Sequence, residues 1–324
     1  MNSLRIHVDL HLQADVRRML EEGTRGHELV FPGKPVSVLS KGENDAEFET
    51  VEVAFGQPDT VAIERARQLR WVHVSSSGIT RYDTPQFRAL AAERGIVVTN
   101  SASVYSGHCA EHVFSFMLAQ ARSLPVALKT RAASGTPEWD ALRSSGRPLE
   151  GQSVVILGYG AIGKRLVELL RPFGMKMMAY RRKARGDEGV PVLDGDRLAE
   201  VLAGGVDHVV NILPASDHTR HFFNAKRFAG MNSGAIFYNI GRGSTVDQDA
   251  LVDALRSKRL TAAWLDVTEP EPLPEGHPLW ELEDCHITPH VAGGHAGEDG
   301  SLVRHFLRNL ERFVHGEAML DRVM

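Results

Sequence analysis

Short apolar runs alternate with amphipathic segments along most of this chain. Apolar runs of about four to eight residues are typical of strands buried in a parallel sheet, and the amphipathic segments between them are typical of helices that cover the sheet. The alternation therefore predicts an α/β fold with parallel sheets. Because 324 residues are too many for one ordinary core, we expect two domains.

The first third of the chain predicts one small α/β unit. Its expected strands cover residues 4–8, 51–55, 71–75 and 96–99, and its expected helices cover residues 58–69 and 85–94. A long helical pattern at about 106–122 precedes a polar stretch at 134–151. The second series has expected strands at 153–157, 176–180, 208–213, 235–240, 262–267 and 286–288, and expected helices at 162–173 and 298–315. We expect the last helix to pack on the first unit.

The charge and the cysteine content argue against several classes of protein. The chain has a formal net charge of −4, and a protein with a broad nucleic-acid-binding face is usually basic. We therefore expect its partner to be a small molecule. Cys109 and Cys285 are too few for a disulfide framework or a zinc cluster, and we interpret both as buried structural thiols. No signal-peptide or transmembrane pattern is present. We therefore expect a cytoplasmic protein with no membrane contact and no metal.

A glycine-rich loop follows the apolar run 153–157. It reads Gly158, Tyr159, Gly160, Ala161, Ile162 and Gly163. In this fingerprint the first glycine allows a tight turn, the second lets the backbone approach a pyrophosphate, and the third lets the helix pack on the strand. The N-terminus of the following helix offers N–H groups and a favourable dipole to the phosphates. Methyltransferases carry similar loops, but this strand–loop–helix context favours a dinucleotide site.

Basic residues follow the next expected strand, where an acidic residue normally binds the ribose hydroxyls of NAD. This chain has Arg181, Arg182 and Lys183 there. Arginine can pair with a 2′-phosphate through charge-assisted hydrogen bonds. The segment therefore predicts NADPH as the preferred cofactor, with NADH as the alternative. The competing interpretation is that these cations only solvate a surface turn.

Three polar turns follow later strands of the second series, at residues 239–243, 266–272 and 288–290. Strand carboxyl ends face the ligand crevice of an open parallel sheet, so we expect these turns to meet there. The glycines on either side of Arg242 form a tight turn that can aim this side chain inward.

These turns hold the groups that reduction of a 2-keto acid requires. Arg242 can bind the carboxylate and polarise the adjacent carbonyl. His290 can protonate the carbonyl oxygen, and a carboxylate such as Glu271 can hold its other nitrogen and favour the protonated form. Taken singly, each residue also fits a solvated turn, a surface loop or a structural histidine. Their order behind successive strands favours the catalytic interpretation.

In these residues the chain resembles the D-isomer-specific 2-hydroxyacid dehydrogenase family. The match includes the glycine loop, Leu213-Pro214, Thr219 and the three polar turns, with a weaker match before Gly151. The resemblance implies two Rossmann or flavodoxin-like domains: a substrate domain at 1–100 and 291–324, and an NAD(P)-binding domain at 101–290 inserted into it. It also implies a homodimer built largely through the nucleotide domain.

By motif position, the resemblance implies that Arg242 binds and polarises the substrate, that His290 is the catalytic acid and that Glu271 supports it. Backbone N–H groups at Ser77, Gly78 and Ile79 are implied to assist Arg242 in binding the substrate carboxylate, and His290 is implied to contact the substrate as the acid. Asp266 is implied to meet the nicotinamide carboxamide. The full set of expected cofactor contacts is Gly158, Tyr159, Gly160, Ala161, Ile162, Gly163, Arg181, Arg182, Leu213, Pro214, Thr219, Ile240, Gly241, Asp266, His290 and Gly293.

Two departures from the family pattern concern specificity. Arg181 replaces the usual acid, and the loop at Ser76 to Gly78 is less glycine-rich than in many members. The first departure resembles NADPH-using glyoxylate and hydroxypyruvate reductases. We therefore expect a reductase that converts a small 2-keto acid to a D-2-hydroxy acid by hydride transfer from NADPH. The alternative from a different class is a dinucleotide-sensing or co-repressor-like binding protein on the same fold. A methyltransferase is disfavoured because Arg242 and His290 would have no role in it.

Overall fold

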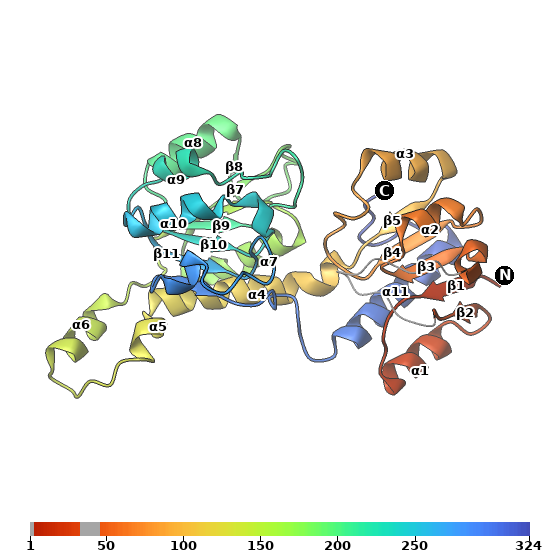
Figure 1. Cartoon of the computed structure of the whole chain (residues 1–324), viewed down its shortest axis with the longest axis horizontal. Helices are drawn as coiled ribbons and strands as arrows, with labels where there is room; N and C mark the ends of the chain where they lie inside the picture. The colour runs from red at the N-terminus through yellow and green to blue at the C-terminus, as the bar shows by residue number, and fades with distance from the viewer. Residues whose placement is uncertain (1–2, 33–45) are drawn as a thin grey trace. The chain divides into compact units, whose positions relative to one another are not determined.

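The computed structural model describes residues 3–32 and 46–324, which form two compact units (Figure 1). One unit contains Met1–Tyr105 together with Gly294–Met324, and the other contains Ser106–Gly293. The sequence placed the divisions near residues 100 and 290. The second unit is therefore inserted between two segments of the first.

The first unit is a five-stranded parallel sheet in the order β2-β1-β3-β4-β5. Its strands are β1 (Arg5–Val8), β2 (Glu28–Val30), β3 (Val53–Gly56), β4 (Trp71–Val74) and β5 (Val97–Thr99). Its helices are α1 (Ala14–Gly23), η1 (Ala46–Thr50), α2 (Thr60–Arg65), α3 (Pro85–Arg94) and α11 (Glu298–His315).

Alternating side chains of the first sheet build a core on each face. On β3, Val53 and Phe55 face α1 and α11, whereas Ala54 faces α2 and α3. The ring of Phe306, from α11, stacks on Phe55 with centroids 4.3 Å apart and on Trp71 with centroids 5.1 Å apart. The C-terminal helix thus completes the core of the first unit, as its apolar positions predicted.

The second unit is a seven-stranded parallel sheet in the order β12-β11-β10-β9-β6-β7-β8. Its strands are β6 (Ser153–Leu157), β7 (Lys176–Tyr180), β8 (Val192–Leu193), β9 (His208–Asn211), β10 (Ala235–Asn239), β11 (Leu260–Leu265) and β12 (Cys285–Ile287). Its helices are α4 (Ala102–Ala121), which begins in the first unit, α5 (Leu124–Ala127), α6 (Pro137–Ser145), α7 (Ala161–Leu170), η2 (Arg171–Phe173), α8 (Gly195–Ala203), α9 (Ala225–Ala229), η3 (Gly243–Thr245), α10 (Gln248–Arg256) and η4 (Pro278–Glu281).

The strand order of the second unit reverses at β6. The chain proceeds outward to β7 and β8, then returns to place β9 on the other side of β6. Ligands of open α/β sheets bind at such a switch point, outside the carboxyl ends of the strands. Because all these strands are parallel, the glycine loop and the three polar turns lie at one edge of one sheet.

Several element boundaries differ from those expected. The helix expected at 58–69 covers only Thr60–Arg65, and the long helix begins at Ala102 rather than near residue 106. The strand expected at 208–213 ends at Asn211, and the one expected at 262–267 begins two residues earlier, at Leu260, and ends at Leu265. The helix expected at 162–173 is α7 followed by η2, and the polar stretch 134–151 contains α6.

The fold class follows the prediction: both units are parallel α/β sheets. No helix within residues 3–32 and 46–324 is long and apolar enough to cross a membrane. Those residues also contain no group of three or more His, Cys, Asp or Glu side chains placed to hold a metal ion.

Candidate active site

The glycine loop joins β6 to α7 and depends on glycine at two positions for different reasons. Gly158 has a φ of +96°, and a Cβ there would lie 2.5 Å from the carbonyl oxygen of Ile212. A Cβ at Gly163 would lie 3.1 Å from the carbonyl oxygen of Gly158, where α7 packs against the loop. The loop is therefore packed too tightly against the ends of β6 and β9 for a side chain at Gly158 or Gly163.

Gly160 is different because a Cβ at this position would meet no atom within 4 Å. It immediately precedes α7, whose first residues are Ala161 and Ile162. The loop thus presents open space in front of a helix N-terminus, which suits a pyrophosphate that approaches the backbone. The residues present therefore fit a dinucleotide.

Tyr159, the second residue of the loop, is buried rather than open to a ligand. Its hydroxyl donates to the carbonyl oxygen of Glu188 at 2.6 Å, and only 5% of the residue is exposed. Burial is also the main reason that the pKa of Tyr159 lies above its ordinary value. The tyrosine therefore links the glycine loop to the segment after β7.

The structure places Arg181 in an ion pair that the sequence analysis missed. Its Nη1 donates to Oε1 of Glu188 at 2.9 Å, and both side chains are mostly buried. The neighbouring Arg182 is exposed. The two arginines expected to bind a 2′-phosphate thus differ: one has a carboxylate partner within the chain and the other faces solvent.

Buried asparagines fix the turns after β9 and β10. The Nδ2 group of Asn211 donates to Oδ1 of Asn239 at 3.0 Å and to the hydroxyl of Thr245 at 2.7 Å. Oδ1 of Asn239 also accepts from the backbone N–H of Gly241 at 3.1 Å, and Oδ1 of Asn211 accepts from that of Leu213 at 3.2 Å. Asn211 was not singled out in the sequence, although an asparagine ending an apolar strand is a usable signal.

The expected cofactor contacts after β9 form a compact turn. The hydroxyl of Thr219 donates to the carbonyl oxygen of Pro214 at 2.6 Å, and Leu213 is buried. A Cβ at Gly241 would lie 2.7 Å from the carbonyl oxygen of Leu213. The turns after β9 and β10 therefore touch at Gly241, next to Ile240.

Arg242 follows this contact. Its Nη1 donates to the carbonyl oxygen of Gly241 at 2.6 Å, while its own carbonyl accepts from the hydroxyl of Thr245. Gly243 has no room for a side chain, because a Cβ there would lie 1.9 Å from the carbonyl oxygen of Thr268. Close packing at Gly243 thus brings the turn that carries Arg242 against the turn that carries Glu271.

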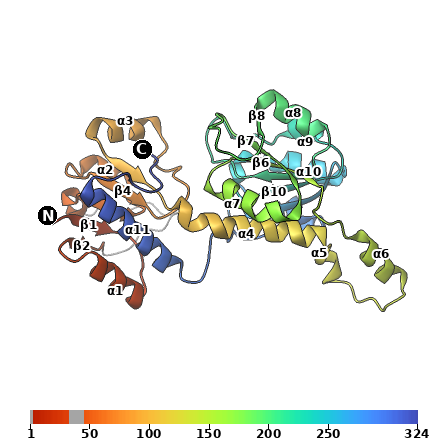
Figure 2. The same ribbon diagram turned by 180° about the vertical axis from the view of Figure 1, so that it is seen from behind.

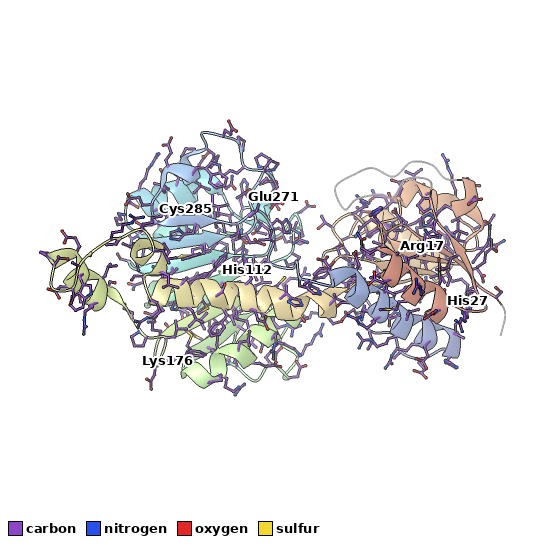
Figure 3. All side chains as sticks on the ribbon, turned by 90° about the horizontal axis from the view of Figure 1, so that it is seen from below. Arg17, His27, His112, Lys176, Glu271 and Cys285 are labelled. Atoms are coloured by element: carbon purple, nitrogen blue, oxygen red, sulfur yellow. The ribbon has the colours of Figure 1, made fainter. Side chains whose placement is uncertain are left out.

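His290 and Glu271 form a hydrogen bond. Nδ1 of His290 lies 2.8 Å from Oε2 of Glu271, and Oε1 of Glu271 accepts from the backbone N–H of Thr268 at 3.0 Å. Half of the His290 side chain is exposed, and its Nε2 has no hydrogen-bond partner among the described residues. One ring nitrogen is therefore held by a carboxylate while the other is open. Figure 3 labels Glu271 in the second unit, together with His112 on α4.

The hydrogen bond to Glu271 raises the pKa of His290 above its ordinary value, against the opposing effects of burial and of the Arg242 charge. Burial by itself would raise the pKa of Glu271, but the hydrogen bonds from His290 and from the Thr268 N–H outweigh it and hold that pKa low. Burial lowers the pKa of Arg242, which Glu271 partly offsets. Glu271 therefore shifts the pKa of both His290 and Arg242, and each of those two groups shifts the pKa of Glu271.

Asp266 supports the turn that carries His290. Its Oδ1 accepts from the Thr288 hydroxyl at 2.6 Å and from the Val291 N–H at 2.9 Å, and its Oδ2 accepts from the Ala292 N–H at 2.9 Å. His290 has a φ of +53°, a conformation that non-glycine residues rarely adopt. The bonds to Asp266 hold the chain in this conformation, so Asp266 has a positioning role besides the cofactor contact expected for it.

His112 lies beside this turn and was not identified from the sequence. Its Nε2 is 3.2 Å from the hydroxyl of Thr288 and 3.6 Å from Oδ1 of Asp266. Burial lowers the pKa of His112, against the effect of Asp266. No motif marks a single histidine in a helix, so sequence reasoning had no signal for this contact.

The expected carboxylate-binding residues Ser77, Gly78 and Ile79 lie in the first unit, after β4. The carbonyl oxygen of Ser77 accepts from Asn100, and that of Gly78 accepts from the hydroxyl of Ser76. No hydrogen bond in the described parts of the chain uses the N–H groups of residues 77–79. The loop is thus held by its carbonyls, and its N–H groups are left for another partner. Gly293 ends the second unit.

Both cysteines are reduced in this structure. Cys109 is buried in α4, and burial raises the pKa of the half-buried Cys285 to about 12. Cys285 lies on β12 (Figure 3). A thiol with so high a pKa is a poor nucleophile at neutral pH, in keeping with a structural role.

A scan against protein families matches residues 114–292 to the NAD binding domain of D-isomer specific 2-hydroxyacid dehydrogenases. The glyoxylate reductase/hydroxypyruvate reductase of Homo sapiens is 34% identical over 228 residues, which cover 70% of this chain and 70% of that protein.

Two solved structures resemble this chain over nearly its full length. A D-isomer specific 2-hydroxyacid dehydrogenase from Xanthobacter autotrophicus, in complex with NADPH and MES, has a TM-score of 0.79 and 26% identity, covering 99% of this chain and 98% of its own. An NADPH-dependent glyoxylate/hydroxypyruvate reductase from Sinorhizobium meliloti, in complex with NADP and malonate, has a TM-score of 0.74 and 26% identity, covering 100% of this chain and 97% of its own.

Proposed function

Because the chain belongs to the D-isomer-specific 2-hydroxyacid dehydrogenase family of NAD(P)-dependent oxidoreductases, we propose that it reduces a small 2-keto acid of the glyoxylate or hydroxypyruvate type. The product is a D-2-hydroxy acid. NADPH is the preferred cofactor and NADH the alternative. The names of the human and Sinorhizobium relatives support the substrate class.

The observation that carries this proposal is the hydrogen bond between His290 and Glu271 beside Arg242. Reduction of a 2-keto acid needs a cation for the carboxylate and an acid for the carbonyl oxygen, and both are at the carboxyl edge of the second sheet. A binding protein that only senses a dinucleotide has no use for a histidine whose pKa is raised by a hydrogen bond to a carboxylate.

Arg242 binds the substrate carboxylate and polarises the neighbouring carbonyl through its remaining N–H groups. The N–H groups of Ser77, Gly78 and Ile79 assist in binding that carboxylate. A bound nicotinamide dinucleotide supplies the hydride. His290 donates the proton on Nε2 to the carbonyl oxygen, while Glu271 keeps hold of Nδ1 and stabilises the charged ring until the proton has left.

The expected cofactor preference rests on the cations after β7 and on the absence of an acid at the end of that strand. The relatives from Xanthobacter and Sinorhizobium, whose names include NADPH or NADP, support the same preference. Gly160 lets the pyrophosphate approach the backbone, while Gly158 and Gly163 shape the loop around it. Ile240, Gly241, Asp266 and Gly293 are among the further cofactor contacts.

The active form is a homodimer in this proposal. Helices α5 and α6 have no buried residue, and Leu124, Val126 and Leu128 near α5 are exposed. Both helices lie away from the sheet of the second unit (Figure 2). Short helices without buried side chains are marginal in water, so a second copy of the chain is the expected cover for this segment.

The proposal is tested by following the absorbance of NADPH, and of NADH in parallel, with glyoxylate, hydroxypyruvate and larger 2-keto acids. Faster oxidation of NADPH with the small keto acids is the expected result. Oxidation of NADH in preference to NADPH contradicts the cofactor assignment. No turnover across the panel, with NADPH binding retained, favours the dinucleotide-sensing alternative.

A further inference from the structure

The segment after β7 has one acidic side chain at its centre. Glu188 is nearly buried, and its carboxylate accepts from Nη1 of Arg181 at 2.9 Å, from the backbone N–H of Arg185 at 2.7 Å and from that of Gly186 at 2.9 Å. These bonds fold residues 181–188 around one carboxylate. They also hold the pKa of Glu188 below its ordinary value, chiefly through the Arg185 N–H.

The same residue contacts the glycine loop. The carbonyl oxygen of Glu188 accepts from the hydroxyl of Tyr159 at 2.6 Å. Glu188 therefore joins three parts of the predicted cofactor site: the end of β7 through Arg181, the segment that follows it, and the second residue of the glycine loop.

The charges around Glu188 divide into paired and unpaired groups. Arg181 pairs with Glu188, and Lys164 of α7 pairs with Asp187 at 2.8 Å. Arg182, Lys183 and Arg185 are exposed and form no ion pair with any described residue. The unpaired cations thus lie on the outside of the segment whose shape Glu188 determines.

Glu188 is badly placed to bind the ribose hydroxyls itself. Only 3% of its side chain is exposed, and its carboxylate already accepts three donors. To bind the ribose hydroxyls, a carboxylate must have an oxygen that is accessible and free to accept a hydrogen bond. Its role toward a cofactor is therefore indirect.

We propose that Glu188 is a positioning residue for selectivity toward the 2′-phosphate of the cofactor. It holds Arg181 as a fixed support, so that Arg182 and Arg185 present their guanidinium groups to the phosphate. This inference rests on the proposed preference for NADPH. It assigns the direct phosphate contacts to Arg182 and Arg185 and gives Arg181, the residue that departs from the family pattern, a supporting role.

The direction in which Glu188→Gln changes the affinity for a 2′-phosphorylated ligand separates this positioning role from a simple charge effect. A carboxylate near a phosphate site repels the phosphate, so charge alone predicts that Glu188→Gln strengthens binding of a 2′-phosphorylated ligand. A positioning role predicts the opposite, because the neutral amide loses the charge-assisted bonds that order the segment.

The experiment uses calorimetry on the full-length chain with two probes, adenosine 2′,5′-bisphosphate and adenosine 5′-monophosphate. The wild type is expected to bind the bisphosphate more tightly. In Glu188→Gln the affinity for the bisphosphate is expected to fall about tenfold, as for loss of a charge-assisted hydrogen bond. The affinity for the monophosphate is expected to stay within about twofold. Asp187→Asn, which removes an exposed carboxylate of the same segment together with its pair to Lys164 of α7, is the matched control for charge alone and is expected not to lower the ratio of the two affinities.

The proposal is overturned by tighter bisphosphate binding in Glu188→Gln, by equal loss of affinity for both probes, or by selective loss of affinity for the monophosphate. A wild type that does not distinguish the probes contradicts the NADPH preference itself, whereas a wild-type preference that survives Glu188→Gln contradicts only the role of Glu188. If that variant does not fold, Tyr159→Phe decides the question. It keeps every charge, removes the bond to the Glu188 carbonyl, and is expected to weaken bisphosphate binding selectively; an unchanged ratio overturns the proposal.

Discussion

His290 has one ring nitrogen on a carboxylate and the other facing solvent, and this asymmetry gives the residue its proposed chemistry. Glu271 fixes the orientation of the ring and favours the charged form. Arg242 opposes that charge slightly, but its own positive charge is needed for the substrate carboxylate. Glu271 thus favours the protonated ring that donates the proton, while Arg242 provides the positive charge that binds the substrate anion.

Replacement of His290 by Gln removes the proposed acid and keeps a polar side chain of similar length. Turnover is expected to fall by about 10²- to 10⁴-fold, which is the usual contribution of a general acid. The dissociation constant for NADPH, measured by fluorescence titration, is expected to change little because the proton transfer acts in the transition state. Undiminished turnover removes His290 from the catalytic role.

The pH dependence of reduction follows from the raised pKa of His290. Reduction needs the protonated ring, so the rate is expected to fall as the pH rises through the pKa of His290, with a midpoint above that of an ordinary histidine. In Glu271→Gln the largest cause of the upward shift is lost, so the fall is expected at lower pH. Rate–pH profiles for both proteins test this, and coincident profiles contradict the role of Glu271.

At the scale of elements, the loop between β6 and α7 contains one glycine that the fold requires and one that only ligand binding would require. Gly158→Ala places a Cβ at a positive φ and 2.5 Å from the Ile212 carbonyl, so the free energy of unfolding is expected to fall by about 1–3 kcal/mol. Gly160→Ala meets no atom and is expected to keep its melting temperature but lose affinity for NADPH.

Thermal unfolding and NADPH titration of these two variants separate folding from binding. The comparison is informative because the substitutions are chemically identical and lie two residues apart. Normal NADPH affinity in Gly160→Ala would mean that no phosphate approaches this part of the loop.

The strands of the second unit were well predicted because their signal is local. The apolar runs at 153–157 and 176–180 end at turn residues, and the structure has β6 and β7 with these bounds. The sequence missed β2 and β8, which have three and two residues, and α6, which has only two large apolar side chains, Trp139 and Leu142, and no fully buried residue. The helices α1, α8, α9 and α10 were also not identified.

The sequence could place those residues of the candidate site that directly follow predicted strands. Arg242, Glu271 and His290 follow parallel strands, so topology alone places them at one edge. The partner of Arg181 was not predictable, because Glu188 lies in an irregular segment with no periodicity that relates the two positions. The support that Asp266 gives to Val291 and Ala292 depends on backbone N–H groups, which leave no mark in a sequence.

At the scale of the whole molecule, the exposed apolar residues of the second unit need an explanation that the single chain does not supply. Leu128 is 83% exposed and Val126 is 58% exposed, next to two helices that bury nothing. Such side chains cost free energy in water unless another surface covers them. Association of two copies through this segment is the explanation that the proposed homodimer offers.

Leu128→Glu places a charge in the middle of this segment and is expected to convert the dimer to a monomer, because burying an unpaired carboxylate costs more than the contact gains. The control is Val61→Glu, which introduces the same charge at an exposed valine of the first unit and is expected to stay dimeric. Light scattering after size-exclusion chromatography gives the mass of each protein. A monomeric wild type contradicts the homodimer, whereas a dimeric Leu128→Glu places the interface elsewhere. Because the glycine loop and the catalytic turns lie in the same unit as α5, cofactor titration of the Leu128→Glu monomer also tests whether that site needs the second copy.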